Sequence, residues 1–129
     1  MSTDEQIALN RRVAEALGWS HFTINAPAGW YGRPYHPAGK RQLEPLPDYC
    51  TDPAAADLVR QEIERRGWGC RLDYPCVGIV GEEERGWSCF IWNEEFEECA
   101  CGKSSPYHAL CLAFLAAHDA TQQEQEARP

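Results

Sequence analysis

The chain of 129 residues lacks three features: long apolar runs, a surplus of positive charge and glycine-rich phosphate loops. No apolar run approaches the roughly 20 residues that a membrane-spanning helix needs. The polar N-terminal stretch MSTDEQIALNRR has no apolar segment of the kind found in signal peptides. We therefore expect a cytoplasmic protein without membrane contact. The sequence has neither the P-loop nor the Rossmann glycine pattern, so these two familiar nucleotide-binding motifs are excluded.

Acidic residues outnumber basic ones, with 20 Asp and Glu against 12 Lys and Arg, for a formal net charge of −8. General binding to a DNA or RNA backbone requires the opposite balance. We therefore expect no general nucleic-acid binding. The length suits a single domain with one modest core.

The seven cysteines cannot all form pairs within the chain, because their number is odd. In a reducing compartment we expect free thiols that act as small buried apolar groups. Cys99 and Cys101 would share one face of a strand, and Cys70 and Cys76 are spaced C-x5-C. A zinc site is the alternative, although neither spacing matches a common zinc knuckle and no His lies at ligand spacing beside them. We expect no metal and no cofactor.

The sequence pattern alternates helical and strand-like segments. A capping box of Thr3 and Gln6 opens a first helix that ends at Gly18. Thr51 is the expected cap of a second helix over Asp52–Arg66. The segment Trp87–Trp92 is apolar on both faces, which predicts a central strand covered on both sides. The other expected elements are strands at Trp19–Ile24, Cys70–Tyr74, Cys76–Val80 and Phe96–Cys101, and a third helix that starts at Pro106.

This order predicts an α/β/α sandwich in which three helices flank a small, mainly antiparallel sheet. We assign residues 1–120 to one domain with a long loop at 25–47, and residues 121–129 to a polar, flexible tail.

The loop is the first candidate binding site, because Ser20–Leu43 contains no Asp or Glu in an otherwise acidic chain. Aromatic rings stack on bases and Arg pairs with phosphates, so this composition suits a nucleotide or a short single strand. The alternative is a surface loop with solvated charges and aromatics packed on the domain; we expect Trp30 to be exposed. The candidate ligand-binding residues here are Trp30, Tyr31, Arg33, Tyr35, Lys40 and Arg41.

A second anion site is predicted at Lys103, Ser104 and Ser105, where the third helix begins. Backbone N–H groups and the helix dipole favour a phosphate there. Ordinary helix capping would explain both serines equally well.

Catalytic patterns are weak, and we expect a protein that is not an enzyme. The paired acids Glu82–Glu84, Glu94–Glu95 and Glu97–Glu98 lie in or beside turns, where charges are usually solvated. Cys111 has His108 one helical turn away, but thiols in the middle of a helix are mostly core residues.

The segments LPDYCTDPAAADLVRQEIERRGW and SSPYHALCLAFLAA carry a family resemblance. Pro47, Tyr49, Thr51, Asp52 and Ala54–Ala56 match one signature, and Ser104, Pro106, Ala109 and Leu110 match a second. With these motifs the chain resembles the phage ABA sandwich domain family, although Cys50 stands where a small hydroxyl residue is expected. The resemblance implies a phage or prophage accessory protein.

Some small phage proteins of this kind are similar to anti-Thoeris proteins, which sequester a cyclic ADP-ribose-type signal without cleaving it. The resemblance therefore implies a counter-defence protein that binds a nucleotide-like ligand. Exposed aromatic residues near a sheet edge favour self-association, so we also expect a homo-oligomer. The alternative is an acidic inhibitor of a host defence protein that mimics nucleic acid, as anti-CRISPR or anti-restriction proteins do, through the acids between Glu82 and Glu98. Those acids could also simply protect strand edges from aggregation.

Overall fold

The computed structural model describes residues 3–25, 29–34, 42–74 and 86–127, which form an α+β fold. The helices are α1 (Thr3–Ala16), α2 (Pro53–Arg65) and α3 (Pro106–Ala127). The strands are β1 (Ser20–Asn25), β2 (Gly29–Arg33), β3 (Glu44–Pro45), β4 (Gly69–Asp73), β5 (Trp87–Trp92) and β6 (Glu97–Lys103). None of the described helices is both long and apolar enough to cross a membrane.

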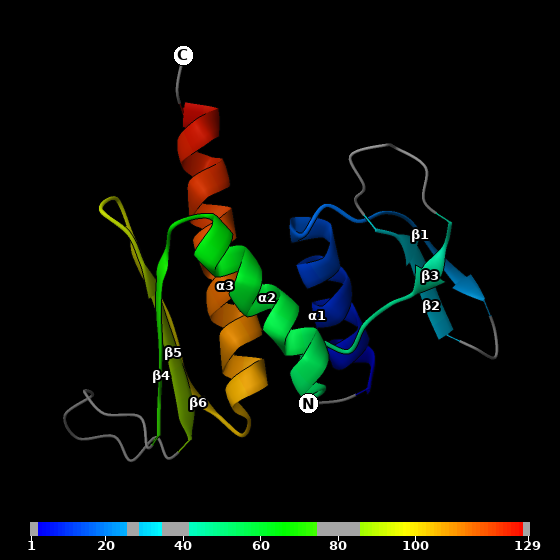
Figure 1. Ribbon diagram of the computed structural model, residues 1–129, viewed down its shortest axis with the longest axis horizontal. Helices are drawn as coiled ribbons and strands as arrows, with labels where there is room; N and C mark the ends of the chain where they lie inside the picture. The colour runs from blue at the N-terminus through cyan, green and yellow to red at the C-terminus, as the bar shows by residue number, and fades with distance from the viewer. Residues whose placement is uncertain (1–2, 26–28, 35–41, 75–85, 128–129) are drawn as a thin grey trace.

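The strands form two antiparallel sheets with the orders β1-β2-β3 and β4-β5-β6. In Figure 1 the helices lie between them, with α3 against β4–β6 and the small β1–β3 sheet beyond α1. The predicted combination of three helices with antiparallel strands is confirmed. The layer order differs from the expected sandwich, because β1 pairs with its sequence neighbour β2 and forms a separate sheet. Pairing neighbouring strands closes the shorter loop, which costs less chain entropy.

The core lies among the helices and the inner face of β4–β6. Its largest fully buried apolar side chains include Val13, Val59, Ile63, Ile91 and Phe114. Within the described residues, β1–β3 contributes no buried hydrophobic side chain to this core. The first sheet is therefore an appendage held by half-buried side chains.

Strand β5 has the predicted bounds and lies at the centre of its sheet. Cys89 and Ile91 point to the helices and are fully buried. Phe90 and Trp92 occupy the other face, where Trp92 remains 41% exposed. In the described part of the chain the helices therefore cover one face of β5, and the expected cover on both faces is not found.

The helix ends correct two predictions. Asp52, not Thr51, caps α2, because its side chain accepts a hydrogen bond from the Ala54 N–H at 3.1 Å. Thr51 instead donates to Asp48. Helix α3 continues to Ala127, so the expected tail is largely helical, in keeping with the helix-forming Gln, Glu and Ala residues there.

The predicted loop at 25–47 is partly regular, because it contains β2 and β3. Two parts of the predicted loop, residues 26–28 and 35–41, fall outside the described residues. The predicted strand at Cys76–Val80 also falls outside them.

Several cysteines are core residues as predicted: Cys50, Cys89 and Cys111 are fully buried. Cys99 and Cys101 share one face of β6 with their sulfurs 4.0 Å apart, but Cys99 is exposed rather than buried. In the part of the chain that the structure describes, no group of three or more His, Cys, Asp or Glu side chains is placed to hold a metal ion.

Candidate functional site

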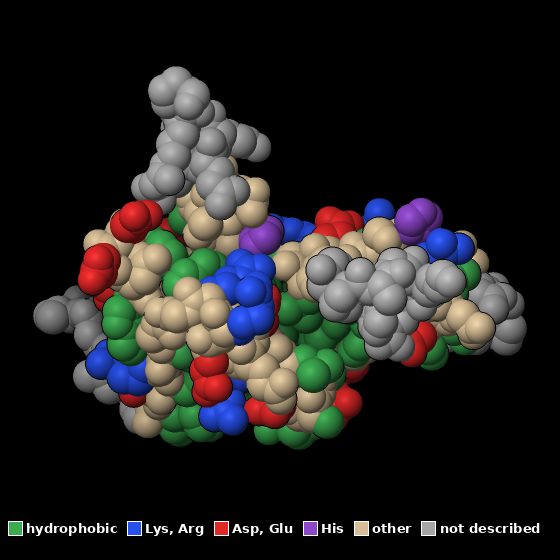
Figure 2. Space-filling model, turned by 45° about the horizontal axis from the view of Figure 1, so that its top comes forward, with side chains coloured by type: hydrophobic (Ala, Val, Ile, Leu, Met, Phe, Trp, Pro, Cys, Tyr) green, Lys and Arg blue, Asp and Glu red, His purple; other side chains and the backbone are tan. Residues whose placement is uncertain are grey.

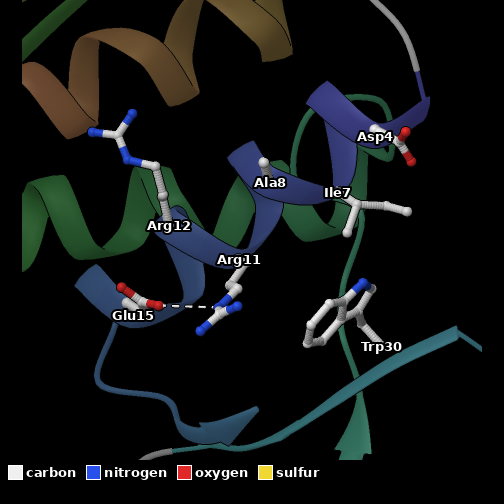
Figure 3. A pocket seen from close by; sticks show the side chains of 7 residues that line it. All are labelled: Asp4, Ile7, Ala8, Arg11, Arg12, Glu15 and Trp30. Atoms are coloured by element: carbon white, nitrogen blue, oxygen red, sulfur yellow. Dashed lines mark hydrogen bonds and ion pairs between the residues drawn. The ribbon is translucent and has the colours of Figure 1, made fainter. Parts of the chain in front are cut away.

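A pocket of about 450 Å³ lies between α1 and β2. Its α1 wall follows one face of the helix, where positions three, four and seven residues apart come together. Figure 3 shows Trp30 of β2 opposite this wall. The lining residues are Asp4, Ile7, Ala8, Arg11, Arg12, Glu15 and Trp30. The pocket thus combines an apolar floor and an aromatic wall with charges of both signs.

Arg11 connects the helix to the first sheet. Its guanidinium carbon lies 5.2 Å from the centre of the Phe22 ring and 5.3 Å from that of Trp30. Both contacts are cation–π contacts. The same guanidinium pairs with Glu15 at 3.2 Å, with both side chains about half exposed (45% and 50%). Such an exposed pair is worth only about 0–1 kcal/mol, so an incoming anion can compete with Glu15 for Arg11.

Arg12 also lines the pocket, but its guanidinium points away from Trp30 and toward α3 (Figure 3). There it pairs with Asp119 at 3.2 Å. Arg11 is therefore the cation that faces the aromatic wall.

Of the predicted loop residues that the structure describes, Trp30 lines this pocket, whereas Tyr31 and Arg33 do not. It is half-buried in β2 rather than exposed as predicted, and the Arg11 guanidinium lies near its ring. Its neighbour Tyr31 pairs with Thr23 and Pro45, and alternation along the strand directs Tyr31 and Arg33 to the opposite face of the sheet. The structure separates these side chains from Trp30.

The other predicted loop residues, Tyr35, Lys40 and Arg41, fall outside the described residues. Their proposed role in binding stays a prediction.

The second predicted site, Lys103, Ser104 and Ser105, lies at the junction of β6 and α3 and takes no part in the wall of the Trp30 pocket. Ser105 accepts a hydrogen bond from the Tyr107 N–H at 3.1 Å, which is helix capping. Capping therefore accounts for Ser105 in this structure, and anion binding there stays a prediction.

None of the six α1 residues in this wall, Arg11, Asp4 and Ile7 among them, was predicted as a site residue. Ile7 is half-buried in the pocket wall, while Leu9 of the same helix is buried in the core. One available signal was the spacing of Asp4, Arg11 and Glu15 along a single helix face that faces away from Val13.

A second hollow of about 560 Å³ lies between α2 and the first sheet, and its wall includes Trp19, Glu44, Tyr49 and Glu62. The Tyr49 hydroxyl is buried without a hydrogen-bond partner among the described residues, and burial raises the pKa of Tyr49. Among the described residues of this wall, two acids, Glu44 and Glu62, stand against one basic side chain, Arg65, which pairs with Glu62. This hollow therefore suits an anion less well than the Trp30 pocket does.

The thiol and imidazole groups of α3 do not form a nucleophile and base pair in the described structure. Cys111 is fully buried and donates to the Tyr49 carbonyl oxygen at 3.4 Å. Its contact with Cys50 and its burial raise the pKa of the Cys111 thiol, which disfavours the reactive thiolate. His118 instead contacts the Arg66 guanidinium at 3.0 Å.

Comparisons with known proteins give one informative likeness. The fold is similar to the crystal structure of a phage protein from Bacillus cereus, with a TM-score of 0.54 and 12% sequence identity. The match covers 87% of this chain and 90% of the phage protein. At this identity the likeness concerns the fold alone. No protein-family model matches the sequence. No curated protein matches it either. Similarity of fold to a phage protein is therefore established, and the resemblance to the ABA sandwich family stays a prediction.

Proposed function

We propose that the chain is a phage-type counter-defence protein that binds a nucleotide-derived immune signal, similar to cyclic ADP-ribose, and sequesters it without cleavage. The observation that carries this proposal is the position of Arg11 over Trp30 in the pocket wall. An aromatic face supports stacking of a base, and a guanidinium supports pairing with a phosphate. The pocket volume of about 450 Å³ falls within the range of small-molecule sites, about 300–1,000 Å³.

The electrostatics of the pocket are compatible with this ligand despite the acidic chain. A phosphate that binds Arg11 displaces Glu15 from an exposed pair, which costs little. It gains charge-assisted hydrogen bonds to the guanidinium, each worth about 1.5–3 kcal/mol. The similarity of fold to a phage protein is consistent with the proposed biological setting.

The test is isothermal titration of ADP-ribose and cyclic ADP-ribose into the wild type, Trp30→Leu and Arg11→Gln. Each substitution removes a stacking or charge-assisted contact, so we expect affinity to fall at least about tenfold. Tyr31→Leu and Arg33→Gln are matched controls on the opposite face of β2 and should keep full affinity. Equal unfolding midpoints would show that the variants remain folded.

Sequestration also predicts that bound ligand is recovered intact after the protein is denatured, as mass spectrometry would show. Cleaved ligand would overturn the non-enzymatic part of the proposal. Loss of affinity in Arg33→Gln but not in Arg11→Gln would move the site to the opposite face of the sheet. Native mass spectrometry of the purified protein would report its oligomeric state in the same experiment.

The acidic inhibitor is the second candidate. Of the acids predicted for it, Glu82–Glu84 fall outside the described residues. The cluster of Glu94, Glu95, Glu97 and Glu98 along the β5–β6 turn and β6 favours this candidate. On the face shown in Figure 2, acidic and basic side chains are interspersed rather than gathered into one acidic patch. This candidate predicts that Glu94→Gln with Glu97→Gln weakens binding to a defence protein and that salt abolishes it. Loss of counter-defence activity in this double variant, with ligand affinity unchanged, would favour the inhibitor.

A further inference from the structure

The Trp30 pocket is asymmetric in charge along the helix axis. Figure 3 shows Arg11 and Glu15 at one end, Trp30 and Ile7 in the middle, and Asp4 beyond Ile7 at the other end. Asp4 lies seven residues before Arg11, about 10 Å along the helix at 1.5 Å per residue. A ligand that spans the pocket therefore meets a cation at one end and a carboxylate at the other.

The two ends differ in how fully they are already paired. Arg11 holds Glu15 and contacts two aromatic rings. Asp4 is exposed and has no hydrogen-bond or ion-pair partner among the described residues. An ionised carboxylate can only accept hydrogen bonds, so its complement is a donor group on the ligand.

These charges orient a nucleotide in one direction. The phosphate is attracted to Arg11 and repelled by Asp4. The base then stacks against Trp30 beside Ile7, and its outer edge points toward Asp4. The groups that distinguish bases lie on that edge: an amino group donates a hydrogen bond, whereas a keto oxygen accepts one.

We propose that Asp4 selects the base of the ligand by accepting a hydrogen bond from an exocyclic amino group, and so disfavours a base with a keto oxygen at that position. This inference rests on the proposed nucleotide site and adds its specificity. A keto oxygen would face the carboxylate without a proton between them, leaving two acceptors opposed.

The competing explanation of Asp4 is local, because an acid in the first turn of a helix stabilises the helix dipole. Glu5 occupies the same turn and does not line the pocket. Glu5→Gln is therefore the matched control for Asp4→Asn. Both substitutions remove one negative charge from that turn, but only Asp4→Asn changes the pocket wall.

The experiment is isothermal titration of ADP-ribose and its hypoxanthine counterpart, inosine diphosphate ribose, which replaces the amino group by a keto oxygen. The wild type and Glu5→Gln should prefer ADP-ribose by about tenfold, the worth of one hydrogen bond. Asp4→Asn should lose this preference, because the asparagine amide can either accept a hydrogen bond from the amino group or donate one to the keto oxygen. Asp4→Ala should bind the two ligands with equal affinity.

The outcomes separate this inference from the function on which it rests. Equal binding of both ligands by the wild type, unchanged in Asp4→Asn, would overturn the role of Asp4 and leave the nucleotide site intact. Failure of the wild type to bind either ligand would overturn the proposed function and this inference with it. A matching shift in Glu5→Gln would assign the effect to the helix dipole, and so would also overturn the role of Asp4.

Discussion

The Asp48 carboxylate joins the start of α2 to α1 through three side chains. It accepts hydrogen bonds from the Gln6 amide at 2.8 Å, from the Asn10 amide at 3.0 Å and from the Thr51 hydroxyl. Burial by itself would raise the pKa of Asp48, but these hydrogen bonds, with one from the Cys50 N–H, lower the pKa below its ordinary value of 3.8. The ionised carboxylate is the form that all of these donors require.

This arrangement predicts an acid-dependent contribution to stability. Because the folded pKa of Asp48 is lowered, its contribution is fully present above the ordinary pKa of 3.8 and is lost as pH falls through the folded pKa. Asp48→Asn should therefore lower the free energy of unfolding at pH 6, and the difference from the wild type should shrink toward pH 2. Urea unfolding at several pH values measures this difference. A difference that stays constant with pH would contradict the role of the charge.

Arg66 shows how a single side chain connects the three helices at their other end. It follows α2, donates to the Ala16 carbonyl oxygen of α1 at 3.0 Å and contacts His118 of α3 at 3.0 Å. Its guanidinium carbon also lies 5.0 Å from the centre of the Trp68 ring and 5.1 Å from that of Phe114. The planar guanidinium can make hydrogen bonds at its edge and aromatic contacts on its face at once, which a lysine could not do.

At the scale of an element, Gly86 allows β5 to start beside the end of β6. A Cβ atom at this position would lie 2.7 Å from the Lys103 carbonyl oxygen and 2.9 Å from the Gly102 carbonyl carbon. Both neighbours are backbone atoms, so no side-chain rotation can relieve the contact. The strand pair is also irregular nearby, between Trp87 and Cys89.

Gly86→Ala should therefore destabilise the fold by about 2 kcal/mol, the usual cost of forcing extra volume into a packed site. Gly67→Ala is a suitable control, because Gly67 has φ +75 and open space around its Cβ position. Gly67→Ala should lower the free energy of unfolding only by the strain of an alanine at positive φ, about 1 kcal/mol. The free energy of unfolding in urea measures both. Equal costs would mean that the β5–β6 contact is not restrictive.

At the scale of the whole molecule, the two sheets differ in how they are held. The β4–β6 sheet packs its inner face on α3 and places Cys89 and Ile91 in the core. The β1–β3 sheet supplies no buried hydrophobic side chain among the described residues and depends on Trp19, Phe22 and the Arg11 contacts. A sheet with so little buried apolar area opens at lower free energy than the core.

Native-state hydrogen exchange should therefore separate the sheets. Amides of the β1–β2 ladder should exchange through local opening, at a free energy well below that of global unfolding, whereas β5 amides should require global unfolding. A ligand in the Trp30 pocket should slow exchange in β1–β2, because the pocket wall belongs to that sheet. Exchange of both ladders at one free energy would contradict this difference.

The elements that sequence analysis located best are those with local signals. The bounds of β5 follow from the apolar run Trp87–Trp92, and α2 follows from the proline and the apolar stripe that includes Val59 and Ile63. The errors at helix ends are also local, because Thr51 and Asp52 are both good caps and only the backbone conformation of Asp52 decided between them. Trp30 was predicted as a candidate binding residue because the sequence alone shows an aromatic residue within a stretch that has no Asp or Glu.

By itself the sequence determined three helices, antiparallel strands and an excess of negative charge, and it indicated Trp30 as a candidate residue, because periodicity, capping and composition act within a few residues. Only the tertiary structure decided that β1 and β2 form their own sheet and that Arg11 meets Trp30, which lies 19 positions further along the chain. It also placed Tyr31 and Arg33 on the opposite face. Such contacts depend on strand register and helix packing, which are set by burial over the whole molecule rather than by the pattern of any one segment.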